Sequence, residues 1–245
     1  MNKEKILGFD VCDASETQIL KNIFEDYNRN IQNFIVNINP EIVINNYINE
    51  NFVKELNSQK YQIPDGIGIV YASKIKKGNI KTRITGIDFM EKICQEAVKH
   101  SAKIFLYGSN LGVADKAATE LENKFQGIKI VGTCDGYCDE EIAVNKIKKS
   151  NADIVFVALG NPKQENFIIN NKSKLENVKI FMPVGGSFDV ISKNIKRAPK
   201  WIRKMNLEWL YRLFKQPIRL FRQIKIVKFI FLVIKEKRRE KNGKN

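Results

Sequence analysis

Short apolar runs alternate with amphipathic stretches through the first 195 residues of the chain. Runs of this length, with turn residues around them, are typical of strands that are buried on both faces of a sheet. Because these strands alternate with helices, the pattern predicts an α/β fold with a Rossmann-like parallel sheet flanked by helices. The predicted strands are 4–9, 33–38, 60–63, 103–107, 129–133, 153–159 and 179–184.

Start signals place helices between these strands. Ser15 with Gln18 three residues later matches a capping box, and Ile19 and Ile23 follow at helical spacing. Pro40 is well tolerated in the first turn of a helix, so a helix is predicted over 41–49. Further helices are predicted after Gly66, from Thr85, over 113–125 and 139–150, and after Glu165.

The last fifty residues, 196–245, have a different composition. They hold 17 Lys/Arg and 3 acidic residues, whereas the preceding 195 residues hold 25 and 24, so nearly all of the net charge of +15 lies here. Their apolar run 224–234 carries lysines within it and at its end, and it is shorter than the about 18 residues of a spanning helix. We therefore predict two units: an α/β domain over 1–195, and a C-terminal basic amphipathic helical appendage over 196–245 whose surface suits a partner that is both anionic and apolar.

The remaining composition favours a cytoplasmic protein. Four scattered cysteines form no CxxC pair, which is typical of a reduced compartment and does not indicate a zinc site. The N-terminus also lacks the long apolar core of a signal peptide.

Small and polar residues follow the predicted strands, where the carboxyl ends of parallel strands form a ligand crevice. Glycines let a ligand approach the backbone and helix N-termini favour phosphate, so these positions predict a nucleotide or sugar-nucleotide ligand. No GxGxxG or GxxxxGK[ST] motif occurs, which disfavours a dinucleotide site or a P-loop. The candidate substrate-binding residues are Asn37, Asn39, Asn110, Tyr137, Gly160, Gln164, Glu165, Gly185, Gly186 and Asp189.

Four polar residues near the ends of the predicted strands and the starts of the predicted helices have two interpretations each. Asp65, in Pro-Asp-Gly, either caps a turn or acts as a general base at a strand end. Arg83 is either a solvated surface residue or a clamp on a diphosphate. Gln164 and Glu165 either open a helix or contact sugar or phosphate.

A missing motif bears on metal use. No Asp-x-Asp sequence occurs, although glycosyltransferases that hold a divalent cation on the donor diphosphate usually need such a carboxylate pair. No metal and no cofactor are therefore predicted, and cations and backbone amides would have to neutralise a diphosphate.

Motifs in a fixed order link the chain to a known family. The chain resembles the WecG/TagA/CpsF family of bacterial glycosyltransferases, and especially its N-acetylmannosaminyltransferases of wall teichoic acid synthesis. The matching motifs are Asn37-Ile-Asn39-Pro40, Pro64-Asp65-Gly66-Ile-Gly68, Gly86-Ile-Asp88-Phe89-Met90, Gly160-Asn-Pro-Lys-Gln164-Glu165, Gly185-Gly-Ser-Phe-Asp189, Arg197-Ala-Pro199, Leu207-Glu-Trp-Leu-Tyr-Arg212-Leu and Pro217-Ile-Arg219.

The resemblance implies an activity and a role for single residues. It implies metal-independent, inverting transfer of ManNAc from a UDP-sugar donor, UDP-ManNAc, to the C4 hydroxyl of GlcNAc-diphospho-undecaprenol, an early step of wall teichoic acid linkage-unit synthesis. Asp65 would be the general base, Asn39 would hold a sugar, and Arg83 would neutralise the leaving diphosphate. Gln164 would contact the donor and Asp189 the nucleoside. Asn37 stands where the family often has threonine.

The resemblance also gives the appendage a function. In the family it meets the membrane and completes the active site, which places the protein on the inner face of the cell membrane. Arg212, Arg219 and Arg222 fall on the family's arginine positions and would bind the diphosphate of the lipid acceptor. Self-association into a homo-oligomer through the apolar tail is compatible with this interpretation. Another UDP-sugar donor is the main alternative, and nucleic-acid binding by the basic tail is disfavoured because no RNA-binding motif occurs.

Overall fold

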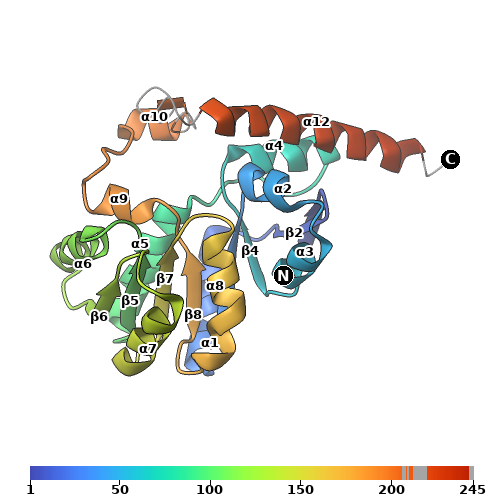
Figure 1. The fold of residues 1–245 in the computed structure, drawn as a ribbon. Helices are drawn as coiled ribbons and strands as arrows, with labels where there is room; N and C mark the ends of the chain where they lie inside the picture. Colours follow the sequence, from blue (N-terminus) through green and yellow to red (C-terminus); the bar gives the residue numbers. More distant parts are fainter. Residues whose placement is uncertain (206–207, 209, 212–219, 243–245) are drawn as a thin grey trace.

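The computed structural model describes residues 1–205, 208, 210–211 and 220–242, and for 204, 220–224 and 242 it describes the backbone alone. A six-stranded sheet with the order β4-β3-β8-β7-β5-β6 forms its centre, and all of its strand pairs are parallel (Figure 1). The predicted α/β fold is therefore confirmed. The strands are β3 (Asn33–Ile38), β4 (Tyr61–Pro64), β5 (Lys103–Gly108), β6 (Lys129–Cys134), β7 (Ile154–Ala158) and β8 (Ile180–Pro183).

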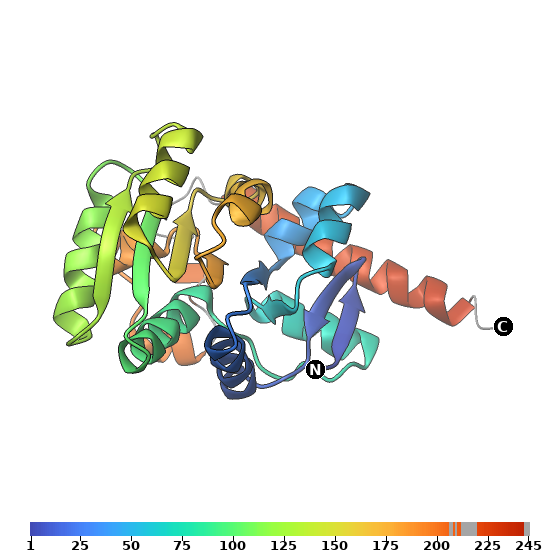
Figure 2. The same cartoon turned by 90° about the horizontal axis from the view of Figure 1, so that it is seen from below.

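The single strand predicted over 4–9 is wrong. The chain forms an antiparallel hairpin there, with β1 (Lys3–Ile6) and β2 (Phe9–Cys12). Leu7 and Gly8 both have positive φ, 48° and 87°, which is the requirement of a two-residue turn that matches the twist of the strands. A leucine in that conformation gives no turn signal in the sequence. The hairpin packs beside β4, as Figure 2 shows from below.

Helices cover both faces of the sheet. One face carries α2 (Pro40–Asn46), α3 (Glu50–Asn57), α4 (Ile67–Lys76), α7 (Glu140–Ser150) and α8 (Lys163–Asn171), and α12 (Leu220–Asn242) packs on α2 and α4. The other face carries α1 (Glu16–Asn28), α5 (Gly86–Lys99), α6 (Val113–Lys124) and α9 (Ser187–Ile191). Alternation along β3 shows the division, because Val36 belongs to the first core and Ile35 to the second.

Capping side chains decide where the helices begin. Ser15 accepts a hydrogen bond from Gln18 N at 3.2 Å, as predicted. The single helix predicted over 41–49 is wrong in its extent: α2 ends at Asn46, and Asn49 caps α3 by accepting from Phe52 N at 3.2 Å. An asparagine side chain competes well for such backbone groups, so it starts a new helix instead of continuing the first.

The C-terminal helix α12 lies across α2 and α4 (Figure 1). Phe229 and Val233 are fully buried in the first core, and Lys76 of α4 forms ion pairs of 2.8 Å with both Glu236 and Glu240. The basic helical appendage is thus present, and one of its stripes packs on the α/β body. Among the described helices, none combines the length and apolarity needed to cross a membrane. Two short elements are also present, the helix α10 (Lys200–Lys204) and the 3₁₀ helix η1 (Lys172–Lys174).

Candidate active site

A cavity of about 350 Å³ lies at the edge of the sheet where the parallel strands end. Segments that follow β3, β4, β7 and β8 form most of its wall, and the start of α5 adds Thr85, Gly86 and Ile87. This is the edge at which open parallel sheets bind ligands. Eight residues predicted from the sequence line the cavity: Asn37, Asn39, Asp65, Gly160, Gln164, Glu165, Gly185 and Gly186.

Asp65 is held at the end of β4 by groups outside its own turn. Its N–H donates to Ile38 O at 2.8 Å, which extends the pairing of β3 with β4 by one bond. Its Oδ2 accepts from Asn39 Nδ2 at 3.3 Å, and its Oδ1 accepts from Gly86 N at 3.4 Å. The side chain of Asn39 and the backbone of Gly86 therefore orient the carboxylate, and Asp65 lines the cavity.

Asn37 and Gly86 shape the space beside this carboxylate. Asn37 Nδ2 donates to Pro183 O at 2.8 Å, which turns its Oδ1 away from that carbonyl. This Oδ1 is buried and has no hydrogen-bond partner among the residues that the structure describes, so its capacity to accept a hydrogen bond is unused. A Cβ atom on Gly86 would lie 3.1 Å from Asn37 Nδ2 and 4.0 Å from Asp65 Oδ2. The glycine keeps the two side chains accessible from one side.

Two glycine loops form another part of the wall. Gly160 follows β7 and Gly185 follows β8, with φ of 75° and 51°, values that favour glycine. Gln164 joins the loops, because its Oε1 accepts from Gly160 N at 3.2 Å and from Gly185 N at 3.0 Å. Glu165, with 2% of its surface exposed, accepts from Gln164 Nε2 at 2.9 Å. Burial raises the pKa of this carboxyl above its ordinary value.

Other predicted residues form a second group along the same edge. Tyr137 OH donates to Asn110 Oδ1 at 3.0 Å, with the tyrosine 79% exposed. Ser109, in the turn that follows β5, donates from Oγ to Asp189 Oδ2 at 3.3 Å. None of these four residues is in the lining of the cavity. They follow β5, β6 and β8 at the carboxyl ends of the strands.

Arg83 is not in the cavity lining either. Its Nη2 donates to Arg203 O at 3.1 Å. Nearby, Arg197 binds Asp88 with both terminal nitrogens, at 2.6 and 2.7 Å. Burial alone would raise the pKa of the Asp88 carboxyl, but the hydrogen bonds and charge of Arg197 hold that pKa below its ordinary value. This pair ties the start of the appendage to α5; both residues stand in motifs, but their spacing in the sequence gives no sign that they meet.

Comparison with known proteins identifies the family. The sequence model of the "Glycosyl transferase WecG/TagA/CpsF family" matches residues 4–243. The chain belongs to this family. The expected family membership is therefore confirmed, and with it a glycosyltransferase activity.

Several relatives in the WecG/TagA/CpsF family share one name, N-acetylglucosaminyldiphosphoundecaprenol N-acetyl-beta-D-mannosaminyltransferase. The protein of Bacillus subtilis (strain 168) is 35% identical over 98% of this chain and 94% of its own length. That of Bacillus spizizenii is 35% identical over 97% and 93%, and that of Staphylococcus aureus (strain MW2) 34% identical over 99% and 96%. The similarity thus includes both the α/β body and the appendage.

The arginines that the family resemblance assigns to the lipid diphosphate are placed only in part. Arg212 and Arg219 lie outside the described residues, and of Arg222, on α12, only the backbone is described. A neighbouring contact locates this region: Lys225 Nζ donates to Asn45 Oδ1 at 2.8 Å, and Asn45 Nδ2 donates to Asn161 Oδ1 at 3.2 Å. Because Asn161 lines the cavity, the beginning of α12 lies close to it.

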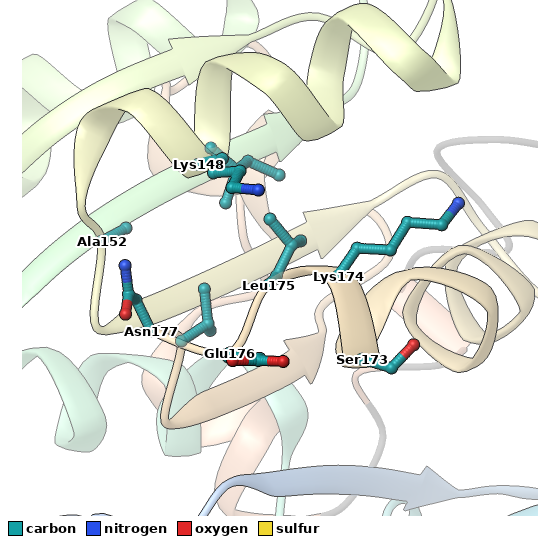
Figure 3. Close-up of a pocket in the computed structure, with 9 residues that line it drawn as sticks. Lys148, Ala152, Ser173, Lys174, Leu175, Glu176 and Asn177 are labelled. Atoms are coloured by element: carbon teal, nitrogen blue, oxygen red, sulfur yellow. The ribbon is translucent and has the colours of Figure 1, made fainter.

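A second cavity, of about 380 Å³, lies at the opposite end of the sheet, where the strands begin (Figure 3). Exposed polar side chains from the end of α7 and from 173–177 surround it, and it contains none of the family motifs. No group of three residues able to hold a metal ion occurs in the part of the chain that the structure describes. The cavity beside Asp65 is the candidate active site because eight of the residues predicted from the sequence line it.

Proposed function

We propose that this protein transfers N-acetylmannosamine from UDP-ManNAc to the C4 hydroxyl of GlcNAc-diphospho-undecaprenol, with inversion and without a metal ion. The names of the relatives in Bacillus and Staphylococcus describe a mannosaminyl transfer to this lipid. The observation that carries the proposal is the carboxylate of Asp65, held by Asn39 and Gly86 at the end of β4 inside the cavity.

Asp65 would act as the general base. The acceptor hydroxyl gives its proton to the Asp65 carboxylate while its oxygen forms a bond to the anomeric carbon of the donor. The bond from that carbon to the diphosphate breaks on the opposite face, and its electron pair leaves with UDP. One displacement of this kind inverts the anomeric centre. Asn39 keeps the base in place through its Nδ2, and Asn37 Oδ1 supports the proposal as a buried acceptor for a substrate N–H or O–H.

The leaving diphosphate needs positive charge from outside the described lining of the cavity. That lining contains the carboxyl groups of Glu41, Asp65 and Glu165 and no lysine or arginine. The contact of Lys225 with Asn45 supports the appendage as the source of cations, since Arg222 precedes Lys225 by about one helical turn. Guanidinium groups bind phosphate groups in a bidentate geometry. We therefore propose Arg212, Arg219 and Arg222 as ligands of the lipid diphosphate. Arg83 would bind the leaving diphosphate.

The outer side of α12 supports binding to a membrane surface. Val227, Phe231 and Ile234 are exposed at positions i, i+4 and i+7, which places them on one face of the helix. Lys228 and Lys235 are also exposed on this helix, and each basic residue near an anionic leaflet contributes about 1 kcal/mol. We propose that this face rests on the inner leaflet and brings the cavity to its lipid-linked acceptor.

One assay tests the proposal. The purified full-length protein is incubated with a short-chain GlcNAc-diphospholipid and each of several UDP-sugars, and UDP release is measured with and without chelator. We expect acceptor-dependent release with UDP-ManNAc that chelator does not reduce. Preference for another UDP-sugar would establish the alternative donor. Absence of acceptor-dependent release with every donor would overturn the proposal.

A further inference from the structure

A chain of hydrogen bonds runs along the wall of the cavity. Gln164 Oε1 accepts from Gly160 N and Gly185 N, and Gln164 Nε2 donates to Glu165 Oε1 at 2.9 Å. The other carboxylate oxygen of Glu165 accepts from Asn161 Nδ2 at 3.0 Å. Gln164 thus connects the loops after two neighbouring strands, and Glu165 connects Gln164 to Asn161.

The series of hydrogen bonds continues to helix α2. Asn161 Oδ1 accepts from Asn45 Nδ2 at 3.2 Å and from Asn46 Nδ2 at 3.4 Å, both on α2. Each amide in this series uses its N–H group toward Glu165 or toward the oxygen of the next amide. The carboxylate of Glu165 accepts from both sides, and it orients the amide of Asn161 and, together with the Gly160 and Gly185 N–H groups, the amide of Gln164.

We propose that Glu165 is a positioning residue: its ionised carboxylate orients the amides of Gln164 and Asn161 and so sets the positions of the two glycine loops that receive the donor. This inference rests on the proposed function, since it names how the same site is kept in shape. A carboxylate accepts at both oxygens, whereas a carboxylic acid or an amide must donate at one of them. A protonated carboxyl or an amide at position 165 would therefore direct its own donor group at the N–H group of Gln164 or of Asn161. One of the two hydrogen bonds would be lost.

Two hydrogen bonds stabilise the buried carboxylate of Glu165. With 2% of its surface exposed, its carboxylate is removed from water, and burial raises its pKa. A charge in such a place is costly unless hydrogen bonds compensate for it. The bonds from Gln164 and Asn161 do so, and both donors are residues of the loop after β7 or the first turn of α8. Both carboxylate oxygens of Glu165 accept hydrogen bonds from protein side chains.

The test exchanges the carboxylate and the amide between positions 161 and 165. Glu165→Gln puts an amide N–H against either Gln164 or Asn161, and Asn161→Asp puts a second carboxylate against Glu165. The double variant N161D/E165Q keeps one charge and restores every bond: the introduced amide donates to the introduced carboxylate, whose other oxygen accepts from Asn45 and Asn46. The exposed Glu176→Gln, at the other end of the sheet, is the matched control.

We expect E165Q and N161D each to raise the KM for the UDP-sugar about tenfold, the equivalent of one or two hydrogen bonds, with the KM for the lipid acceptor unchanged. The double variant should return to within about threefold of the parent chain. Amide hydrogen exchange provides a readout without activity: exchange of the Gly160 and Gly185 N–H groups should accelerate in both single variants and recover in the double variant.

Each result has a distinct meaning. Unchanged exchange at Gly160 and Gly185 in E165Q, or a double variant no better than the single ones, would overturn the positioning role. Recovery of exchange without recovery of the donor KM would place Glu165 in direct contact with substrate and overturn it as well. If the parent chain releases no UDP at all, the proposed function fails, while hydrogen exchange still decides whether Glu165 holds the loops.

Discussion

Asn39 Nδ2 lies 3.3 Å from Asp65 Oδ2, while Asn39 Oδ1 accepts from Ile42 N at 2.9 Å. The same side chain therefore caps α2 and orients the carboxylate at the end of the neighbouring strand. Its capping bond fixes which end of the amide faces Asp65, because the oxygen is occupied by the helix. The geometry of the candidate base thus depends on the start of α2, and this dependence can be tested.

Asp65→Asn should reduce transfer by at least about a hundredfold, because an amide of the same shape cannot take the proton of the acceptor hydroxyl. UDP binding should be little changed, since the proposed role is that of a base and not of a donor contact. UDP release measures the first effect and calorimetric titration with UDP the second. Turnover close to that of the parent chain would remove Asp65 from this role.

Asn39→Asp separates the two functions of Asn39. Aspartate is as good an N-cap as asparagine, so thermal stability should change by less than about 1 kcal/mol. The new carboxylate would face Asp65, however, and two like charges at this distance raise the pKa of one of them. We expect the pH profile of kcat to shift to higher pH. Asn39→Ala, the comparison variant, should instead lose about 1 kcal/mol of stability with its cap. An unshifted profile in Asn39→Asp would show that Asn39 does not act on the base.

Gly86→Ala should lower activity and leave the fold intact. Alanine favours a helix more than glycine does, and Gly86 is the first residue of α5, so stability should not fall. The added methyl group would lie 3.1 Å from Asn37 Nδ2, on the side from which Asn37 and Asp65 are reached. We expect kcat/KM to fall about tenfold, or ~1.4 kcal/mol. Thermal unfolding is the control, and a lower Tm would assign the loss to the fold.

The ion pair of Asp88 with Arg197 should make the free energy of unfolding depend on pH in the acidic range. Since the pKa of Asp88 is lowered in the folded state, its contribution is complete above the unfolded pKa of about 3.9 and is lost as the pH falls through the folded value. Urea unfolding from pH 7 to pH 3 measures this. Asp88→Asn should be less stable at neutral pH by on the order of 1 kcal/mol, because Asp88 is partly exposed and screened. The difference from the parent chain should shrink below about pH 4; a constant difference would contradict the pairing.

Local signals in the sequence were enough for most of the sheet. The runs 33–38 and 103–107 are apolar because both of their faces are buried, so their strands were predicted correctly. The turn at Leu7 was missed because its positive φ follows from the pairing of the hairpin and not from the residue type. Likewise, the motifs indicated Gln164 and Glu165, but only the fold shows that the Gln164 oxygen joins two loops 25 residues apart in the chain (Gly160 and Gly185). Contacts between distant segments depend on packing, which no local pattern contains.

Substitutions at Phe229 and Phe231 test the two faces of α12 independently, because Phe229 faces the α/β body and Phe231 is exposed. Phe229 is fully buried against the α/β body, so Phe229→Ala should cost about 3–5 kcal/mol of unfolding free energy, or loosen the helix from α2 and α4. Phe231 is 64% exposed, and Phe231→Ala should change stability by less than about 0.5 kcal/mol. Binding to vesicles that contain anionic lipid should show the opposite ranking of the two variants. Phe231→Ala should weaken this binding roughly tenfold, because the side chain that is lost is one that enters the membrane interface. Denaturant unfolding and vesicle sedimentation measure the two effects on the same preparations. Equal vesicle binding by Phe231→Ala and the parent chain would show that the exposed stripe is not the membrane contact, whatever the stability of Phe229→Ala.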